Sequence, residues 1–487
     1  MTYADTIARL CEQGLIISDS RLSDVSGGSF PHRYPGTGLV QAEVPMAGQK
    51  EVDAAVAAAR EALPAWRGTA PGERGRLLGK LADLLAEHAE EFGDILTRES
   101  GRAIRDTVLD GHFASAWTRY YAGYADKLDG SVVSSAPFSG LDYVLPEPYG
   151  VVAAIIPWNI ALLSMAMKTA PALAAGNTVV AKPPELTPFA ALRFGELALE
   201  AGIPPGVLNV IPGDGATGDA LVRHQGIDKI SFTGGEATAR AVMRAAAETL
   251  KPMTLELGGK AASIVFPDAD LDVAVNFAIH MSTVYWTGQG CVLPTRLFVH
   301  DDIYDAVSAR LVEIAQSYRV GDPLDPETAV GPVIDERSRD RIIGVIDAAK
   351  SAGMGKLLTG GNRVEGDLAG GYFIAPTVFG DVDNSSSLAQ NEIFGPVLSI
   401  LRFRDEVEVV AKANDTRYGL AAYVFTSDMS RGHRMARDLE AGYVCVNGFS
   451  FAPTAPFGGG KQSGFGREGG KWGIEEFVQQ KNVFVAF

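Results

Sequence analysis

Hydrophobic residues recur with two different periods along this chain. Residues 50–66 and 73–99 carry apolar side chains every three or four positions, which predicts helices that pack ahead of a sheet. From residue 151, short β-branched runs alternate with helical segments. The predicted strands are 151–156, 178–181, 207–211 and 229–232, and the predicted helices are 161–175, 190–201, 219–224 and 236–250. Alternation of this length predicts a parallel, doubly wound α/β sheet.

A second α/β block is expected from residue 262 to about 455. Its strand-like runs are 263–266, 296–300 and 397–403, and its clearest helix is 303–318. Residues 125–143 and the apolar tail 477–487 fit neither block and look like extended arms. The tail either packs as a strand on its own chain or is covered by a partner subunit, and the sequence leaves both open.

Length and charge narrow the class of protein. At 487 residues, two or three domains are expected. The net charge of −16 argues against nucleic acid and anionic membrane as main partners. Lys168 and Pro171 interrupt the most apolar stretch, 161–175, which is too short to span a bilayer.

The three cysteines, Cys11, Cys291 and Cys445, are widely separated and show no metal-ligand spacing. We therefore expect no metal site and a reducing compartment. The first residues show no secretory pattern, so the expected location is cytoplasmic.

Two glycine-rich turns follow predicted strands. Residues 213–218 (GDGATG), which include Gly215, match G-x-G-x-x-G, but the helix after them is short. Residues 232–235 (FTGG) end a strand and open a long helix, so the amides near Gly234 and Gly235 make the better phosphate site. Either turn is also explained by tight chain reversal alone.

An acidic residue lies where a ribose would bind. Glu185 follows the predicted strand 178–181, and a carboxylate there is placed to accept from a ribose 2′-hydroxyl. It would repel a 2′-phosphate, whereas the neighbouring Lys182 would attract one. We therefore expect NAD, with NADP possible; a loop ion pair is the alternative explanation.

Three isolated polar residues suggest one chemistry. Cys291 follows Gly-Gln-Gly, Asn159 follows a buried strand, and Glu256 has apolar neighbours before two glycines. Taken singly, each of these three residues more often has a structural role. Together with a dinucleotide fold they suggest a thiolate that attacks an aldehyde, an amide that stabilises the oxyanion, and a carboxylate that activates water.

Eight motifs in order carry a family resemblance. They are 147–159 (EPYGVVAAIIPWN), 170–177 (APALAAGN), 182–185 (KPPE), 232–234 (FTG), 256–260 (ELGGK), 288–291 (GQGC), 392–397 (EIFGPV) and 456–468 (PFGGGKQSGFGRE). On these motifs the chain resembles the aldehyde dehydrogenase superfamily over roughly residues 30–480.

The resemblance implies roles for individual residues. Cys291 matches the nucleophile, Asn159 and the Cys291 N–H match the oxyanion hole, Glu256 matches the base, and Lys168 matches a lysine near the cofactor and the base. The cofactor contacts implied by the motifs and turns are Ile156, Pro157, Trp158, Lys182, Glu185, Gly215, Gly234, Gly235, Leu257, Glu392 and Phe394.

The resemblance also implies a domain division and an assembly. A Rossmann-type cofactor domain would comprise residues 1–124 and 144–255. A catalytic domain would comprise 256–455, extending to about 470, and a small β oligomerisation arm 125–143 and 471–487. We expect a homodimer or homotetramer. Four residues depart from the family pattern: Gly235, Trp286, Leu293 and Asn391.

The expected substrate channel is apolar and has no obvious cation. Its predicted lining is Leu162, Met165, Met167, Val292, Phe451 and Phe457. This lining favours bulky apolar or aromatic aldehydes over charged ones. Two other functions stay open: a coenzyme A-acylating dehydrogenase, which Glu256 disfavours, and a non-catalytic dinucleotide-binding protein, which the Cys291, Asn159 and Glu256 set disfavours.

Overall fold

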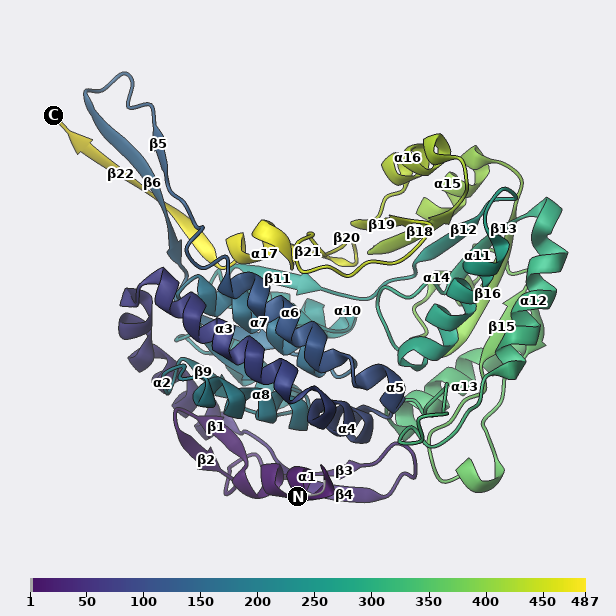
Figure 1. Cartoon of the computed structure of the whole chain (residues 1–487), viewed down its shortest axis with the longest axis horizontal. Coiled ribbons are helices and arrows are strands. Elements are labelled where there is room, and N and C mark those ends of the chain that lie inside the picture. Colours follow the sequence, from purple (N-terminus) through teal and green to yellow (C-terminus); the bar gives the residue numbers. More distant parts are fainter. Residues whose placement is uncertain (1–2) are drawn as a thin grey trace.

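The computed structural model describes residues 3–487. Two α/β blocks lie side by side, and a β arm projects from the first block (Figure 1). The first block contains an eight-stranded sheet. In spatial order its strands are β2 (Ser20–Leu22), β1 (Leu15–Ile17), β9 (Leu208–Val210), β8 (Thr178–Lys182), β7 (Val151–Ile155), β10 (Lys229–Thr233), β11 (Met253–Glu256) and β21 (Gly464–Phe465).

The five central strands, β9 to β11, are parallel, and the pairs β1–β9 and β11–β21 at either side are antiparallel. The predicted doubly wound sheet is therefore confirmed. β21 lies in the part of the chain that the domain prediction gives to the second block, yet it pairs with β11. Gly464 makes this possible, because a Cβ there would lie 1.9 Å from the Leu255 carbonyl oxygen.

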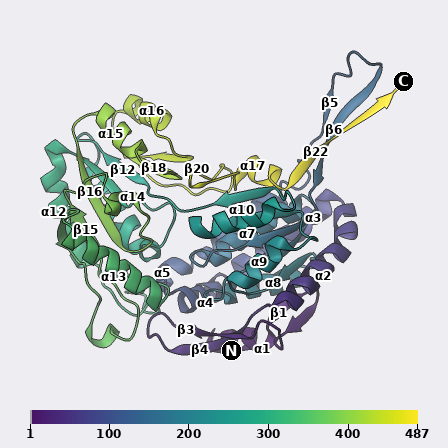
Figure 2. The same cartoon turned by 180° about the vertical axis from the view of Figure 1, so that it is seen from behind.

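Helices cover both faces of this sheet. α2 (Gln49–Gly68), α9 (Gly215–Arg223) and α10 (Glu236–Ala247) pack on the face that carries Val151 and Ala153. The opposite face carries Val152 and Ala154. Its covering helices are α3 (Pro71–Glu87), α4 (Ala89–Ser100), α6 (Asp110–Ala122), α7 (Ala161–Ala174) and α8 (Phe189–Glu200). Figure 1 is seen from the side of α3 and α6, and Figure 2 from the side of α2, α9 and α10.

Two predicted helices differ from the structure. Residues 73–99 form α3 and α4, because the chain breaks at His88 (φ −95°, ψ 19°). Both helices pack on one core, so the apolar period continues across the break. The predicted short helix 219–224 begins earlier, at Gly215, because the Asp214 side chain accepts from Ala216 N and Thr217 N and caps it.

The second block contains a seven-stranded sheet that is parallel except for the β14–β15 pair. Its strands are β14 (Lys356–Thr359), β15 (Thr377–Gly380), β16 (Val397–Phe403), β13 (Arg296–His300), β12 (Ala262–Val265), β18 (Ala421–Phe425) and β19 (Tyr443–Val446). Its helices are α11 (Leu271–Ile279), α12 (Tyr304–Ser317), α13 (Glu336–Ser351), α14 (Ser387–Gln390), α15 (Glu406–Asn414) and α16 (Met429–Asp438).

Smaller elements complete the blocks: α1 (Tyr3–Gln13), α5 (Ile104–Thr107), β3 (Ser29–Arg33), β4 (Val40–Pro45), β17 (Tyr418–Gly419), β20 (Gly460–Lys461) and α17 (Gly470–Glu475). α17 buries Gly473 and Ile474 against the first block, although the prediction places its residues in the arm. None of the helices in residues 3–487 has the length and apolarity needed to cross a membrane.

The arm is a three-stranded antiparallel sheet in the order β22 (Val478–Ala486), β6 (Gly140–Pro148), β5 (Ser131–Val133). The tail strand β22 pairs with β6 of its own chain along its whole length. Apolar side chains nevertheless stay exposed on the arm, with Val132 at 75%, Phe138 at 71% and Phe487 at 86%. Pairing within the chain therefore leaves apolar surface on the arm uncovered.

Candidate active site

A cavity of about 360 Å³ lies at the carboxyl ends of β7 and β10, where the first block meets the second. The lining is mainly apolar. It consists of Ile155, Ile156, Pro157, Trp158, Asn159, Ile160, Pro184, Phe232, Thr233, Gly234, Gly235, Thr238, Glu256, Leu257, Gly258, Cys291, Glu392 and Phe394. The structure thus brings Cys291, Asn159 and Glu256, far apart in sequence, into one cavity.

Cys291 follows a tightly wound loop. A π-helical turn, His280–Val284, leads into a turn in which Trp286 (φ 54°) and Thr287 (φ 52°) adopt left-handed backbone conformations. Such conformations are costly for side chains of this kind and concentrate at functional sites. The Cys291 carbonyl oxygen lies so close to Gly259 that a Cβ there would approach within 2.3 Å. Close backbone packing thus fixes the position of Cys291.

The environment of the Cys291 thiol disfavours its ionised form. Burial raises the pKa of the thiol above its ordinary value, and the nearby Glu392 and Glu256 carboxylates raise it further. A cationic group bound in the cavity would lower the pKa of the thiol. The charge state of the Cys291 thiol therefore depends on what occupies the cavity.

Asn159 comes four residues after the end of β7 and is buried. Its Nδ2 atom donates to the Gln289 carbonyl oxygen at 2.9 Å. The amide nitrogen carries two hydrogens, so one remains for a ligand in the cavity that Asn159 lines. Asn159 therefore has one donor left for a ligand in the cavity that Cys291 also lines.

Glu256 is the last residue of β11 and is buried, and neither carboxylate oxygen has a hydrogen-bond partner among residues 3–487. Burial raises its pKa well above the ordinary value. The Glu468 carboxylate raises it further, whereas Lys168 and Arg467 lower it. A buried carboxylate without partners, facing the same cavity as a thiol, has the properties of a general base.

Lys168 does not line the cavity. It is fully buried on α7, and its Nζ donates to Glu468 Oε1 at 2.6 Å and to Ser231 Oγ at 3.1 Å. Lys168 and Glu468 act on Glu256 through their charges. The sequence reasoning missed Glu468, although it is the last residue of the 456–468 motif, because a single glutamate in a glycine-rich segment gives no sign of its burial.

Several predicted cofactor contacts, among them Trp158, Glu392 and Phe394, line the same cavity as Cys291. Trp158 and Phe394 meet edge to face with ring centroids 5.2 Å apart. Glu392 Oε1 accepts from Gly259 N at 3.0 Å, and burial raises the pKa of Glu392 to about 7. A Cβ on Gly258 would approach Glu392 Oε2 within 2.2 Å, so a side chain at this position would displace the Glu392 carboxylate.

The two glycine-rich turns differ in how their amides are used. Gly235 caps α10 without a side-chain hydrogen bond, and Gly234, Gly235 and Thr238 line the cavity. At α9 the Asp214 carboxylate already occupies the first amides, and Gly215 does not line the cavity. Of the two turns, only the one at α10 therefore offers a helix N-terminus to a ligand in this cavity.

The KPPE segment reaches the cavity through Pro184, not through the two predicted residues. Lys182 Nζ donates to the Gly213 carbonyl oxygen at 2.6 Å, and burial lowers the pKa of Lys182 to about 8. Glu185 is half-buried next to Pro184. No sequence pattern singles out Pro184 or Thr238, because their contribution depends on the path of the backbone around the cavity.

The six predicted substrate residues lie outside this cavity, and their role stays a prediction. Leu162, Met165 and Met167 are buried in α7. Phe451 packs against Trp117 and Phe457, with ring centroids at 5.5 and 4.9 Å. The Val292 side chain is buried, and its carbonyl oxygen accepts from Tyr423 Oη at 2.9 Å.

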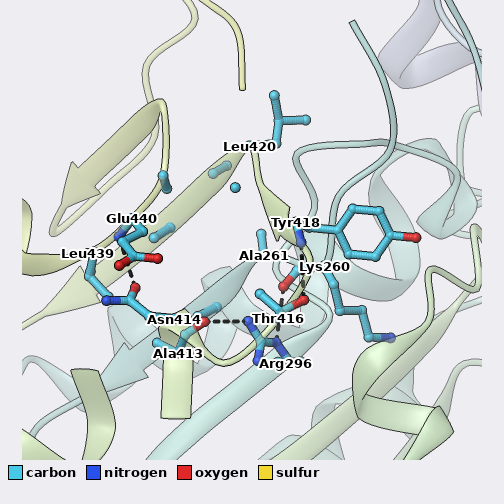
Figure 3. A pocket seen from close by; sticks show the side chains of 15 residues that line it. Lys260, Ala261, Arg296, Ala413, Asn414, Thr416, Tyr418, Leu420, Leu439 and Glu440 are labelled. Carbon is cyan, nitrogen blue, oxygen red and sulfur yellow. Dashed lines mark hydrogen bonds between the residues drawn. The ribbon is translucent and has the colours of Figure 1, made fainter. Parts of the chain in front are cut away.

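A second hollow, of about 20 Å³, is lined by residues that include Lys260, Arg296 and Asn414 (Figure 3). There the buried Arg296 donates to the carbonyl oxygens of Lys260 at 3.0 Å and Ala413 at 2.9 Å. The hollow is too small for a cofactor or substrate. The Arg296 hydrogen bond to the Lys260 carbonyl oxygen instead holds the end of the 256–260 segment. Within residues 3–487, no cluster of three or more His, Cys, Asp or Glu side chains is arranged for a metal ion.

The fold and the cavity define an α/β protein with a thiol, an amide and a carboxylate at a dinucleotide-type sheet. The model of the "Aldehyde dehydrogenase family" matches residues 23–483, and the chain belongs to this family. An aldehyde dehydrogenase of Enchytraeus buchholzi is 45% identical over 478 residues, covering 97% of this chain and 95% of that protein.

Solved structures are similar over nearly the whole length. PnpE from Pseudomonas sp. WBC-3, which has also been solved with nicotinamide adenine dinucleotide, is 42% identical with a TM-score of 0.94, covering 97% of each chain. An NADP-dependent enzyme of E. coli is 37% identical with a TM-score of 0.94, covering 99% of each chain. The predicted fold class and family are confirmed.

The effect of the Glu392 charge on the Cys291 thiol can be tested by substitution. Replacing Glu392 by Gln keeps an acceptor for Gly259 N but removes the carboxylate charge. The pKa of the Cys291 thiol should fall, so more thiolate is present at pH 8. We expect iodoacetamide to alkylate Cys291 faster in Glu392→Gln than in the parent, measured by peptide mass spectrometry. Cys291→Ala gives the background from Cys11 and Cys445. An equal or slower rate in Glu392→Gln would contradict the assigned cause.

Proposed function

We propose that this protein oxidises an aldehyde to the carboxylic acid with NAD(P)⁺, with Cys291 as the nucleophile. The observation that carries the proposal is that Cys291, Asn159 and Glu256 line one cavity. The same cavity has an uncapped helix N-terminus at α10. A thiol, an oxyanion donor, a base and a cofactor site are the parts that this oxidation needs.

In the first half of the reaction, the Cys291 thiolate adds to the aldehyde carbon and the carbonyl oxygen becomes an oxyanion. The free hydrogen of Asn159 Nδ2 and the Cys291 backbone N–H would stabilise that oxygen. Bound NAD(P)⁺ supplies the acceptor for the hydride that leaves the thiohemiacetal carbon. The carbonyl then re-forms, and Cys291 carries a thioester.

In the second half, Glu256 takes a proton from a water molecule, which attacks the thioester carbon. The carbon–sulfur bond breaks, the acid leaves, and the Cys291 thiolate is restored. The raised pKa of Glu256 supports this role, because a base must hold the proton it removes. A base so close to the thioester favours hydrolysis over transfer to coenzyme A.

The cavity has the features needed to hold a dinucleotide. Gly235 leaves open space at the start of α10, and the amides there favour a pyrophosphate. Ile156, Trp158 and Leu257 offer apolar surface, and Glu392 and Phe394 lie at the Cys291 end. We assign Lys182 and Glu185 to the adenosine ribose, beyond Pro184. Residues 1–124 and 144–255 would form the cofactor domain.

NAD is the preferred cofactor in this proposal. Lys182 Nζ donates to the carbonyl oxygens of Gly213 and Asp214, which leaves one of its three hydrogens for the ribose or for a 2′-phosphate. Glu185 adds a negative charge that repels that phosphate. Solved relatives include one bound to NAD and one that is NADP dependent, so the family accommodates both.

Bulky apolar or aromatic aldehydes are the preferred substrates. Phe451 and Phe457 belong to an aromatic cluster with Trp117. Phe457 N donates to the Glu468 carbonyl oxygen at 2.6 Å, and the adjacent Gly458 lies against Glu256. The cluster therefore extends to the proposed base. The exposed apolar surface of the arm supports assembly into a homodimer or homotetramer.

The function is tested by following reduced cofactor over a panel of aldehydes. We expect benzaldehyde-like substrates to be preferred over succinic semialdehyde, and NAD over NADP. Cys291→Ala should lower kcat by about a thousandfold or more, with the Kd for NAD kept. Unchanged oxidation in Cys291→Ala would refute the proposed nucleophile, and a clear preference for succinic semialdehyde would refute the substrate class.

The charges around Glu256 predict a pH shift. Glu468 raises the pKa of Glu256, so Glu468→Gln should lower it. A base works only when deprotonated, so hydrolysis falls as pH drops below that pKa. The acid limb of the kcat profile should therefore move to lower pH in Glu468→Gln. Glu475→Gln, an exposed carboxylate on the same segment, is the control and should leave the profile in place. A shift to higher pH would show that the charge assignment is wrong.

A further inference from the structure

We propose that Trp286 and Leu293 are positioning residues that hold Gly290, and through it the backbone N–H of Cys291, at the reacting centre. These are two of the positions at which the chain departs from its family's pattern. The proposal rests on the proposed function, in which the Cys291 N–H is an oxyanion donor. Its evidence is the packing of both side chains on the residue that precedes the nucleophile.

Gly290 lies between the two side chains. A Cβ placed on Gly290 would approach Trp286 Cε3 within 2.6 Å and Leu293 Cγ within 2.8 Å. Gly290 does not have a positive φ, so space alone requires glycine here. Trp286 is 6% exposed and Leu293 is 1% exposed, so neither side chain has solvent into which it can retreat. The peptide that carries the Cys291 N–H therefore rests on packed side chains.

Trp286 is itself held firmly. Its ring stacks on Tyr285, with centroids 4.6 Å apart and planes at 25°. Arg102 is buried, and its guanidinium lies 5.4 Å from the centroid of the Trp286 ring. Asp110 fixes Arg102 through two hydrogen bonds, of 2.6 and 3.1 Å. These contacts offset the cost of a left-handed backbone at a tryptophan (φ 54°).

The same turn also orients Asn159, the other proposed oxyanion donor. The Trp286 carbonyl oxygen accepts from Gln289 N at 3.0 Å and from Gln289 Nε2 at 3.3 Å. The Gln289 carbonyl oxygen in turn accepts from Asn159 Nδ2 at 2.9 Å. A shift of the Trp286 turn would therefore move both donors of the proposed oxyanion hole.

A purely space-filling role for Trp286 predicts something different. Asparagine adopts the left-handed conformation more easily than tryptophan, so Trp286→Asn relieves backbone strain while it removes the packing. If the indole only fills space, a folded Trp286→Asn protein would lose stability but keep its chemistry. If the indole positions Gly290, the chemistry would change even where the fold is intact.

The test is a double-mutant cycle on Trp286 and Gly290. The variants are Trp286→Asn, Trp286→Phe, Gly290→Ala and Trp286→Asn with Gly290→Ala, each with melting temperature, Kd for NAD, kcat and KM measured. We expect Trp286→Asn and Gly290→Ala each to lower kcat about tenfold, because a displaced donor stabilises the oxyanion less. Trp286→Phe should retain most activity, and the Kd for NAD should be unchanged.

The kcat of the double variant decides whether Trp286 and Gly290 act through the same contact. The added methyl group meets both the indole and Leu293, so removing the indole should relieve part of the collision. The double variant should therefore lose less kcat than the product of the two single losses. A fully multiplicative loss, or a folded Trp286→Asn protein with parental kcat, would overturn the proposal.

Alkylation separates this proposal from the proposed function. The rate at which iodoacetamide modifies Cys291 should change in Trp286→Asn and show the same non-additivity with Gly290→Ala. If the parent protein oxidises no aldehyde, the proposed function fails. The alkylation cycle still decides whether Trp286 positions the loop, and identical rates in all variants would refute that.

Discussion

The hydrogen bond from Asn159 Nδ2 to the Gln289 carbonyl oxygen joins the two α/β blocks at the candidate active site. Asn159 follows β7 of the first sheet, and Gln289 precedes β13 of the second. The bond is buried, so losing it would leave a polar group unsatisfied, at a cost of about 1–3 kcal/mol. The Cys291 loop and the cofactor side of the cavity are therefore tied together by a bond that is expensive to break.

Burial sets the chemistry of the cavity. It disfavours charge on both Cys291 and Glu256, and neighbouring carboxylates add to that effect. Lys168 partly compensates on the Glu256 side from a fully buried position. A neutral thiol is a poor nucleophile, so we expect the Cys291 thiol to react slowly when the cavity is empty. A cationic ligand in the cavity would stabilise the thiolate and couple reactivity to cofactor binding.

The sequence predicted the sheets, the family and the meeting of Cys291, Asn159 and Glu256 in one site, because β-branched runs and glycine turns reflect local backbone requirements directly. It did not separate α3 from α4, since one apolar face continues past His88. The G-x-G-x-x-G match at Gly215 was a weaker guide than the turn at Gly235, because Asp214 uses the amides of α9.

Other features depend on contacts between distant segments. The position of Glu468 near Glu256 depends on β21, which pairs with β11, and on the bridge between Phe457 and Glu468. The same holds for three apolar residues of α7, Leu162, Met165 and Met167. Their spacing predicts that they are buried, but it does not predict which cavity they face. Trp286 and Leu293 are separate departures in the sequence, and only the folded loop brings both against Gly290.

The central claim is that Cys291 carries an acyl group that Glu256-activated water removes. The most direct measurement is the mass of Glu256→Gln protein quenched after mixing with an aldehyde and NAD⁺. The account predicts an added acyl mass, located on the peptide that contains Cys291, that persists because hydrolysis is slowed. Hydride transfer without any acyl adduct on Cys291 would contradict it.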